Sequence, residues 1–257
     1  MQKVFDALTT TWWGISIICI LAVVSWFVLS AVFYRAFFKR FYDVVLSGLA
    51  IVVLSPVFLV LIILGAVKMK GNPFFIQPRP GKDEKIFNLI KFRTMTCETD
   101  ETGKLLPDEK RLTKYGKLLR STSLDELPEL LNIFVGNMSI VGPRPQLVRD
   151  MVFMTDLQRT RHTVKPGLTG LAQCNGRNNM LWETKLEYDL AYIGDISLWK
   201  DMAIIFKTVF KVFKKEGITE EGMATAEDLG DYLLNNGEVT KEDYDKLQEQ
   251  AKELMRV

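Results

Sequence analysis

The chain has 257 residues, of which 48% are hydrophobic and 25% charged, and this composition excludes a disordered or collagen-like protein. Residues 216–257 contain 12 acidic and 4 basic residues, whereas residues 1–215 contain 29 Lys and Arg against 19 Asp and Glu. A basic body with an acidic tail favours anionic partners for the body, such as phosphates or lipid headgroups. Three cysteines without CxxC spacing and a single histidine argue against a disulfide framework, a zinc site and a multi-histidine metal site.

The first apolar segment, Trp12–Tyr34, contains no charged residue. As a helix it would be about 34 Å long, which is enough to cross a hydrocarbon core of ~30 Å. Arg35, Lys39 and Arg40 follow it, and the positive-inside bias places that end in the cytoplasm. The sequence therefore predicts a membrane-spanning helix whose N-terminus lies outside.

The second apolar segment, Val44–Val67, is also uncharged but is interrupted at its centre by Ser55 and Pro56. Proline removes a backbone hydrogen bond and clashes with the carbonyl four residues earlier, here that of Val52, and the Ser55 hydroxyl can satisfy a freed carbonyl. Basic residues flank both ends of the segment. Each half, about 18 Å long, is too short to cross the membrane. This pattern favours a re-entrant helix-break-helix over the alternative, a proline-kinked spanning helix.

A polar body follows the membrane segments. Residues Lys85–Met95 have the aromatic and branched pattern of a strand, after a short apolar piece at Phe74–Ile76. Lys91 and Arg93 then share one strand face, either as part of a site or as a solvated basic surface. Residues Thr96–Asp108 are predicted to form an exposed loop. The chain has no internal repeat, Walker A loop or GxGxxG, so the ordinary nucleotide-binding signatures are absent.

The densest chemistry lies between Leu118 and Pro145. The capping-box spacing of Ser123 and Glu126 predicts a helix that begins at Ser123, or at Asp125 if Pro128 belongs to the first turn. In both cases Asp125 and Glu126 lie at a helix N-terminus, where the dipole lowers carboxylate pKa values. Neighbouring helical side chains point about 100° apart, so the two carboxylates are predicted to have different roles. The alternative is helix capping with solvated acids.

Two arginines, Arg120 and Arg144, flank these acids, and Arg144 lies between two prolines that restrict its backbone. Guanidinium groups match phosphate well, so the arginines, a helix N-terminus and two acids able to hold Mg²⁺ predict a diphosphate site. For Arg144 a structural pairing in a rigid turn is equally consistent. The Gly- and Asn-rich stretch Pro166–Asn179 predicts recognition of a base or sugar. His162 is predicted to be a structural or surface residue and not a catalyst.

The C-terminal part contains a strongly periodic helix, Ser197–Lys215, with lysines on one side and aromatic and aliphatic residues on the other. This pattern indicates a helix in an anionic membrane interface, or alternatively a core-packed helix with exposed lysines. Two acidic helical pieces, Asp228–Leu234 and Lys241–Met255, predict a small hairpin. Its apolar residues are too few for a core of their own and need a partner surface, either the body or a second copy.

In their order along the chain, these motifs resemble the bacterial sugar transferases, specifically the monotopic phosphoglycosyl transferases. The resemblance covers about residues 39–225. It rests on Lys39-Arg40-x-x-Asp43, Ser55-Pro56, Lys91-Phe-Arg-Thr-Met95, Leu119–Pro128, Asn137–Pro145, Pro166–Gln173, Asn175–Asn178 and Glu216-Gly-Ile218. Minimal members begin near Phe38, so residues 1–35 are an added helix. The tail, at Leu234–Tyr244, resembles short C-terminal oligomerisation modules.

The resemblance implies transfer of a phospho-sugar from a UDP-sugar to undecaprenyl phosphate, with Mg²⁺ as cofactor, giving an undecaprenyl-diphosphate sugar and UMP. It implies that Asp125 is the nucleophile and that Glu126 is a metal ligand or acid–base partner. The phosphate-binding residues would be Lys91, Arg120 and Arg144, and the substrate-recognition candidates in the Gly- and Asn-rich stretch are Gln173, Asn175 and Arg177. The ending at residues 216–225 resembles members that use N-acetylated sugars such as UDP-N,N′-diacetylbacillosamine.

The expected fold is a membrane-associated, mainly α protein with a small β element. We expect a transmembrane helix in residues 1–37, a re-entrant helix-break-helix in 38–70, a compact cytoplasmic catalytic domain in 71–225 and an acidic helical hairpin in 226–257. The protein would lie in the bacterial inner membrane with the catalytic domain facing the cytoplasm. Expected partners are the UDP-sugar, undecaprenyl phosphate, anionic lipid and, through the tail, a second copy in a homodimer, but no nucleic acid. The alternative is a non-catalytic membrane scaffold that binds anionic lipid, which would have no need of the acid pair or Arg144.

Overall fold

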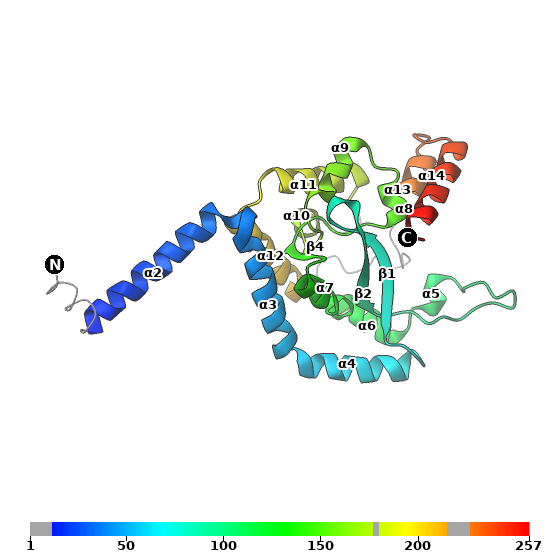
Figure 1. Ribbon diagram of the computed structural model, residues 1–257. Coiled ribbons are helices and arrows are strands. Elements are labelled where there is room, and N and C mark those ends of the chain that lie inside the picture. The colour runs from blue at the N-terminus through cyan, green and yellow to red at the C-terminus, as the bar shows by residue number, and fades with distance from the viewer. Residues whose placement is uncertain (1–11, 177–179, 215–226, 257) are drawn as a thin grey trace.

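The computed structural model describes residues 12–176, 180–214 and 227–256, and these are mostly helical (Figure 1). In chain order the α-helices are α2 (Trp12–Val32), α3 (Lys39–Val53), α4 (Ser55–Lys68), α5 (Asp108–Arg111), α6 (Lys114–Thr122), α7 (Glu129–Val135), α8 (Val148–Met151), α9 (Asp156–Arg159), α10 (Leu171–Asn175), α11 (Trp182–Gly194), α12 (Leu198–Lys214), α13 (Leu229–Asn235) and α14 (Lys241–Leu254). The strands are β1 (Phe74–Pro80), β2 (Ile86–Phe92), β3 (Ser139–Val141) and β4 (Gly167–Thr169). A π-helical turn, η1 (Tyr34–Phe38), and three 3₁₀ turns, η2 (Lys82–Glu84), η3 (Leu124–Glu126) and η4 (Thr160–Thr163), complete the elements.

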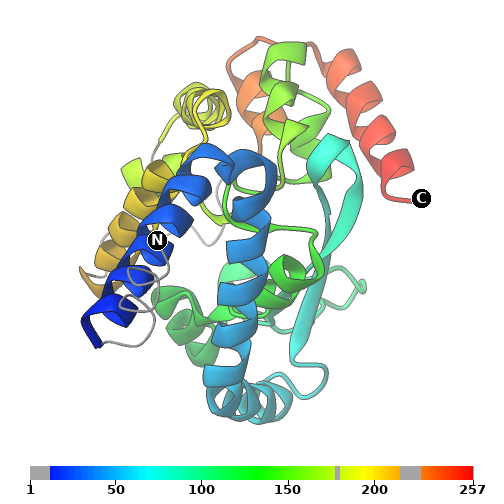
Figure 2. The same ribbon diagram turned by 60° about the vertical axis from the view of Figure 1, so that its left-hand side comes forward.

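Helix α2 projects away from the rest of the molecule, and almost all of its large apolar side chains are exposed (Figure 1). Within the described residues it is long and apolar enough to cross a membrane by itself. Helix α12 runs beside it (Figure 2), where the rings of Phe27 and Trp199 stack with centroids 6.2 Å apart. The predicted N-terminal apolar helix is therefore present, and its orientation in a membrane stays a prediction.

Helices α3 and α4 form the predicted helix-break-helix. They meet at Leu54 with a bend of 64°. The Ser55 hydroxyl donates to the carbonyl oxygen of Val52 at 2.8 Å, which is the carbonyl that Pro56 leaves without an amide partner. The break and its satisfaction by serine are thus confirmed. The length and apolar composition of the pair suit either one broken span or a re-entrant loop, so the topology stays a prediction.

Helix α3 is tied to the body by the charged residues at its start. Arg40 donates to the carbonyl oxygens of Ile133 and Phe134 at 2.6 and 2.8 Å, at the end of α7, where helix carbonyls lack partners. The buried Asp43 carboxylate accepts the backbone N–H of Ile140 at 2.8 Å. Residues of the basic cluster after α2 therefore have structural contacts inside the protein as well as a positive charge.

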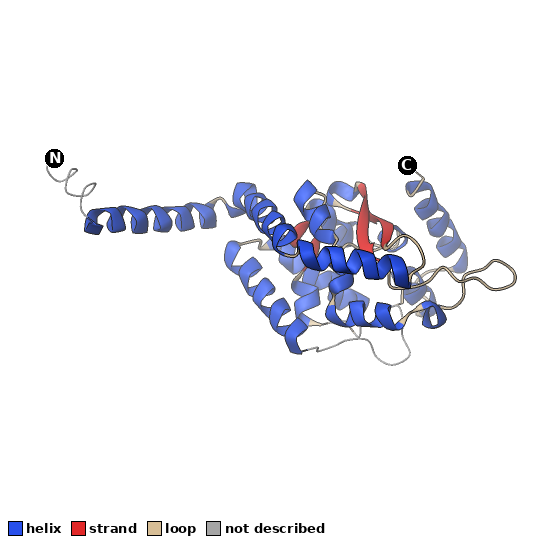
Figure 3. Ribbon diagram, turned by 90° about the horizontal axis from the view of Figure 1, so that it is seen from below, coloured by secondary structure: helices blue, strands red, loops and turns tan. Residues whose placement is uncertain are grey.

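The two sheets each have two strands (Figure 3). Strands β1 and β2 are antiparallel, and β1 extends beyond the predicted apolar piece Phe74–Ile76 through Pro78 and Pro80. Proline is tolerated because each strand of a two-stranded sheet has a free edge. Strand β2 is shorter than predicted, so Arg93 lies just beyond it. Asn132 of α7 bonds the backbone of β2, accepting from the N–H of Ile90 at 3.1 Å and donating to Asn88 at 2.8 Å.

Helix α12 has the predicted periodicity. Its inner face buries Leu198, Asp201 and Ile204, while Trp199 and Phe210 are exposed. One face is therefore core-packed, as the alternative interpretation required, and apolar residues also remain on the surface, as the interfacial interpretation required.

The C-terminal hairpin packs on the body. Leu229 and Ala251 are buried in one core cluster with residues of α8 and α11, including Met151 and Trp182. Asp150 of α8 accepts the backbone N–H of Leu229 at 3.0 Å. Of the two partner surfaces that the sequence left open for the tail, the body is the one that the structure shows.

Candidate active site

The acid pair lies in a tight turn between two helices. Helix α6 ends at Thr122, and Ser123 adopts the left-handed conformation at φ 55°, which reverses the chain. Asp125 and Glu126 then occupy the 3₁₀ turn η3, and α7 begins at Glu129 with Pro128 as its N-cap. The predicted helix start at Ser123 or Asp125 is therefore wrong. The acids lie one turn before the helix, because the proline starts α7 instead of entering it.

Glu126 is the centre of the site. Its Oε1 accepts from Nζ of Lys91 at 2.8 Å and from Nη2 of Arg144 at 2.8 Å. Lys91 comes from β2, and Arg144 from the loop after β3. Lys91, Glu126 and Arg144 span 53 positions of the sequence, and the fold brings them together, as the family resemblance implied.

Arg120 lies in the last turn of α6, just before the acid pair in the chain. Its Nε donates to the hydroxyl of the buried Thr94 at 3.1 Å. The Arg120 charge also acts on the Asp125 carboxyl, as do those of Lys91 and Arg144. All three predicted cations therefore lie close enough to act on the Asp125 carboxyl.

The two carboxylates of the pair differ in their electrostatics. Burial raises the pKa of Asp125, the charge of Glu126 raises it further, and the surrounding cations only partly offset both effects. Burial also acts to raise the pKa of Glu126, but the charges and hydrogen bonds of Arg144 and Lys91 outweigh it and hold that pKa well below its usual range. The expected lowering at both acids is wrong for Asp125, because burial and its neighbour dominate over a helix dipole one turn away.

A third carboxylate, Glu129, belongs to the site and was not predicted. It is the first residue of α7, is buried, and lies with Oε1 3.0 Å from Nζ of Lys91. Burial raises its pKa to about 7, although the Lys91 charge opposes the shift. Its position three residues after Glu126 is the signal that the sequence offered, since such spacing brings side chains together across one helical turn.

The family model described as bacterial sugar transferase matches residues 34–215, which include all of these residues. The chain belongs to the bacterial sugar transferase family. It is 47% identical over 189 residues to the uncharacterized sugar transferase EpsL of Bacillus subtilis, covering 74% of this chain and 94% of EpsL.

Two longer relatives carry more specific names. A UDP-glucose:undecaprenyl-phosphate glucose-1-phosphate transferase of Klebsiella pneumoniae is 44% identical over 68% of this chain, and an undecaprenyl-phosphate galactose phosphotransferase of Salmonella typhimurium is 34% identical over 70%. The matches cover 40% and 41% of those proteins. This sugar transferase therefore spans about two fifths of the length of these relatives.

The carboxylate oxygens of the acid pair of this sugar transferase are the type of ligand that suits a magnesium ion. The described residues contain no group of three or more His, Cys, Asp or Glu side chains that could hold a metal. Mg²⁺ however uses one or two carboxylates together with substrate phosphates, and it keeps several waters. Glu126 and Asp125 supply such a pair. Lys91 and Arg144 both donate to the same oxygen of Glu126, Oε1.

The substrate-recognition candidates lie on and after α10. Gln173 Nε2 donates to the Leu168 carbonyl at 3.1 Å, and Asn175 Nδ2 to that of Leu171 at 2.9 Å. Arg177 lies outside the described residues, as does the ending at residues 216–225. The recognition role of all three residues stays a prediction.

The nearby glycines allow the backbone to pack closely: a Cβ at Gly167 would lie 2.1 Å from the Gly142 nitrogen.

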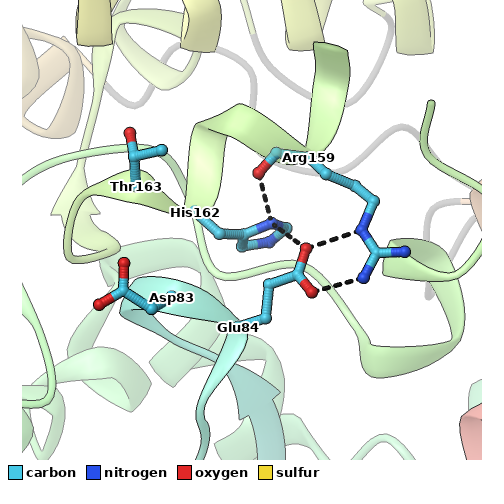
Figure 4. Close-up of a pocket in the computed structure, with 5 residues that line it drawn as sticks. All are labelled: Asp83, Glu84, Arg159, His162 and Thr163. Carbon is cyan, nitrogen blue, oxygen red and sulfur yellow. Dashed lines mark hydrogen bonds and ion pairs between the residues drawn. The ribbon is translucent and has the colours of Figure 1, made fainter. Parts of the chain in front are cut away.

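A separate pocket lies between η2 and η4 (Figure 4). Glu84 and Arg159 form an ion pair across it, and Nδ1 of His162 donates to the Arg159 carbonyl oxygen at 3.1 Å. Burial, with the neighbouring Arg161 charge, lowers the pKa of His162 to about 4. The ring is therefore neutral at physiological pH, and it is buried, so His162 is not the surface residue that the prediction also allowed.

Proposed function

We propose that the protein transfers a phospho-sugar from a UDP-sugar to undecaprenyl phosphate and forms undecaprenyl-diphosphate-sugar and UMP. The observation that carries the proposal is the cluster of Asp125 and Glu126 with Lys91, Arg120 and Arg144 in a chain of the sugar transferase family. Relatives whose names specify undecaprenyl phosphate and glucose or galactose support the same class of reaction.

Asp125 is the nucleophile in this proposal. One of its carboxylate oxygens bonds to the phosphorus that carries the sugar, the bond from that phosphorus to the bridging oxygen breaks, and UMP leaves. An oxygen of undecaprenyl phosphate then attacks the same phosphorus and releases Asp125. The raised pKa of Asp125 makes its ionised form a stronger base, and hence a better nucleophile, than an exposed aspartate.

The surrounding charges allow two anions to approach each other. A carboxylate that attacks a diphosphate is repelled unless cations are present, and Lys91, Arg120 and Arg144 supply three. Glu126 stays ionised because of its low pKa, and it would hold Mg²⁺ with Asp125 beside it. When bound, the ion would neutralise phosphate charge and assist the departure of UMP.

The membrane arrangement is part of the proposal. Helix α2 would span the bilayer, and the bent pair α3–α4 would enter and leave through the cytoplasmic face. The exposed Trp199 and Phe210 of α12 would lie in the interface, so that a lipid-linked phosphate can reach the acid pair.

Nucleotide release by the purified protein tests the proposed function. The protein is incubated with undecaprenyl phosphate, Mg²⁺ and, one at a time, UDP-glucose, UDP-galactose, UDP-N-acetylglucosamine and UDP-N,N′-diacetylbacillosamine. The proposal expects UMP release with at least one of them and none with the matched Asp125→Asn variant. Release of UDP would contradict it, because UDP is the product when a bare sugar is transferred. No nucleotide release with any donor would favour the non-catalytic scaffold.

A further inference from the structure

The loop that carries Arg144 is held through its backbone by two other arginines. Nη2 of Arg161, in η4, donates to the carbonyl oxygen of Arg144 at 2.6 Å. Nη1 of Arg79, in β1, donates to the carbonyl oxygen of Pro145 at 3.0 Å. Two consecutive carbonyls of one loop thus accept from guanidinium groups that lie 82 positions apart in the sequence.

Arg161 is rigidly placed. Its Nε and Nη2 donate to Oδ2 of Asp189, on α11, at 3.0 and 2.6 Å, and both residues are only 2% exposed. A buried ion pair of this kind adds little net stability over an apolar replacement, because both charges lose their hydration. Its hydrogen bond to the Arg144 carbonyl is what an apolar pair could not provide.

The position of Arg79 is energetically unfavourable. Its Nη2 donates to Gln77 Oε1 at 2.7 Å, whereas its Nε is buried and has no hydrogen-bond partner in the described part of the chain. Burial, with the charge of Arg144 nearby, lowers the pKa of Arg79 to about 10. A half-buried cation beside a like charge, with one buried donor unpaired, is unfavourable for stability alone. The contact that it makes is with the Arg144 loop.

The backbone of this loop needs such contacts. Pro143 and Pro145 restrict their own φ angles, but the ψ angles of Arg144 and Pro145 are set by where the two carbonyls point. The Arg144 side chain is 43% exposed and reaches Glu126 through Nη2. The position of the Arg144 guanidinium therefore depends on the peptide planes that Arg161 and Arg79 bind.

We propose that Arg79 and Arg161, the latter together with Asp189, are positioning residues that hold the Arg144 guanidinium where the substrate diphosphate binds. The inference rests on the proposed function only in taking Arg144 as a phosphate-binding residue. Neither arginine touches the reacting atoms, and both act through the backbone of Arg144 and Pro145.

A double-mutant cycle between Arg79 and Arg144 tests this coupling. The full-length protein is purified as wild type, Arg79→Met, Arg144→Ala and the double variant, and kcat/KM for the UDP-sugar and the Kd of UDP are measured for each. Arg79→Lys keeps a donor for the Pro145 carbonyl. Arg159→Met is the matched control, because Arg159 lies beside η4 but pairs with Glu84 instead of the Arg144 loop.

The proposal expects Arg79→Met to lower kcat/KM and UDP affinity about tenfold or more, since small displacements of a binding group are costly. Arg79→Lys should restore most of this loss, and Arg159→Met should change both values less than about twofold. In the Arg144→Ala background, Arg79→Met should have almost no further effect, because the group that it positions is gone.

Equal losses from Arg79→Met with and without Arg144 would overturn the proposal, because a general effect on folding multiplies in both backgrounds. Unchanged kinetics and binding in Arg79→Met would overturn it as well. If the wild type binds UDP but releases no UMP from any donor, the proposed function fails, and the cycle on UDP affinity still decides the coupling.

Discussion

Lys39 and Lys91 are almost equally buried, with side chains 15% and 17% exposed, but they lie in very different surroundings. Lys39 donates to the Val141 carbonyl at 2.9 Å and to the Tyr192 hydroxyl at 3.1 Å, and it pairs with Asp201. The Asp201 carboxylate in turn accepts from the hydroxyls of Tyr34 and Tyr192 at 2.6 and 2.8 Å. The other hydrogen bonds of Lys39 and Asp201 named here are thus made with neutral groups, a carbonyl and two tyrosine hydroxyls.

The surroundings of Lys91 are dominated by charge. It lies between Glu126 and Glu129, with Arg144 and Asp125 close enough to shift its pKa. The pKa values of the three carboxylates move in different directions, downward at Glu126 and upward at Asp125 and Glu129. A network completed by neutral groups holds elements together, whereas one that is crowded with like charges is prepared for a further charged group, which in the proposed function is a diphosphate with a metal ion.

The first prediction separates the two lysines. Lys91→Met should reduce turnover by at least about 100-fold, because a cation facing the transferred phosphate is lost. Its thermal stability should change little, since Glu126 keeps Arg144 and Glu129 can take up a proton. Lys39→Met should instead lower the free energy of unfolding by about 3–5 kcal/mol, because Asp201 loses its cation. Turnover and thermal unfolding of both variants check this, and identical profiles would remove the distinction.

The second prediction concerns the C-terminal hairpin. A cut after Thr225 removes Leu229 and Ala251 from a shared core and exposes Met151 and Trp182 on the body. We expect the free energy of unfolding to fall by about 4 kcal/mol, the sum of a few buried apolar side chains. Chemical denaturation of the truncated and full-length proteins measures it. Equal stability together with a lower oligomer mass would show that the hairpin serves self-association instead.

The third prediction uses Glu129 and pH. Its folded pKa of about 7 lies above the ordinary value, so its ionisation costs the folded state free energy. That cost is absent below about pH 4, grows as the pH rises through 7 and is complete above it. Glu129→Gln should therefore gain stability relative to wild type between pH 5 and 8, by up to about 3 kcal/mol. Denaturation curves across this range that stay parallel would contradict the shift.

The fourth prediction concerns the helix break. Ser55→Ala removes the hydroxyl that donates to Val52 and should cost about 1 kcal/mol. Single cysteines at the exposed positions Arg35 and Lys70, in an otherwise cysteine-free protein, should both resist a membrane-impermeant reagent in intact cells, with and without this change. Labelling at position 70 but not at 35 would show that the segment spans the membrane.

The sequence predicted what local chemistry determines. The break at Pro56 and its satisfaction by Ser55 follow from proline geometry, whereas the grouping of Lys91 with Glu126 and Arg144 was implied by the family resemblance. The start of α7 was placed too early, because the left-handed turn at Ser123 has no signature in its own residues. Strand β1 was missed beyond Ile76, because prolines are allowed only where an edge is free, and that depends on the partner strand.

The positioning contacts could not be predicted from the sequence either, because they too depend on which elements lie side by side in the fold. Arg79 and Arg161 belong to none of the predicted sites, and what they bind are carbonyls, which every residue has. Their partners become visible only when β1 and η4 are placed beside the loop of Arg144. Glu129 is the exception, because its spacing from Glu126 was available in the sequence.

Intact mass spectrometry of the wild-type protein tests the central claim, the covalent role of Asp125, most directly. The protein is mixed with a UDP-sugar that supports UMP release, with Mg²⁺ and without undecaprenyl phosphate, so that the second step cannot occur. We predict a mass increase equal to one phospho-sugar in the wild type, its loss when undecaprenyl phosphate is added, and no increase in Asp125→Asn. An adduct of the same mass in Asp125→Asn, with the asparagine shown to be intact, would contradict the assignment.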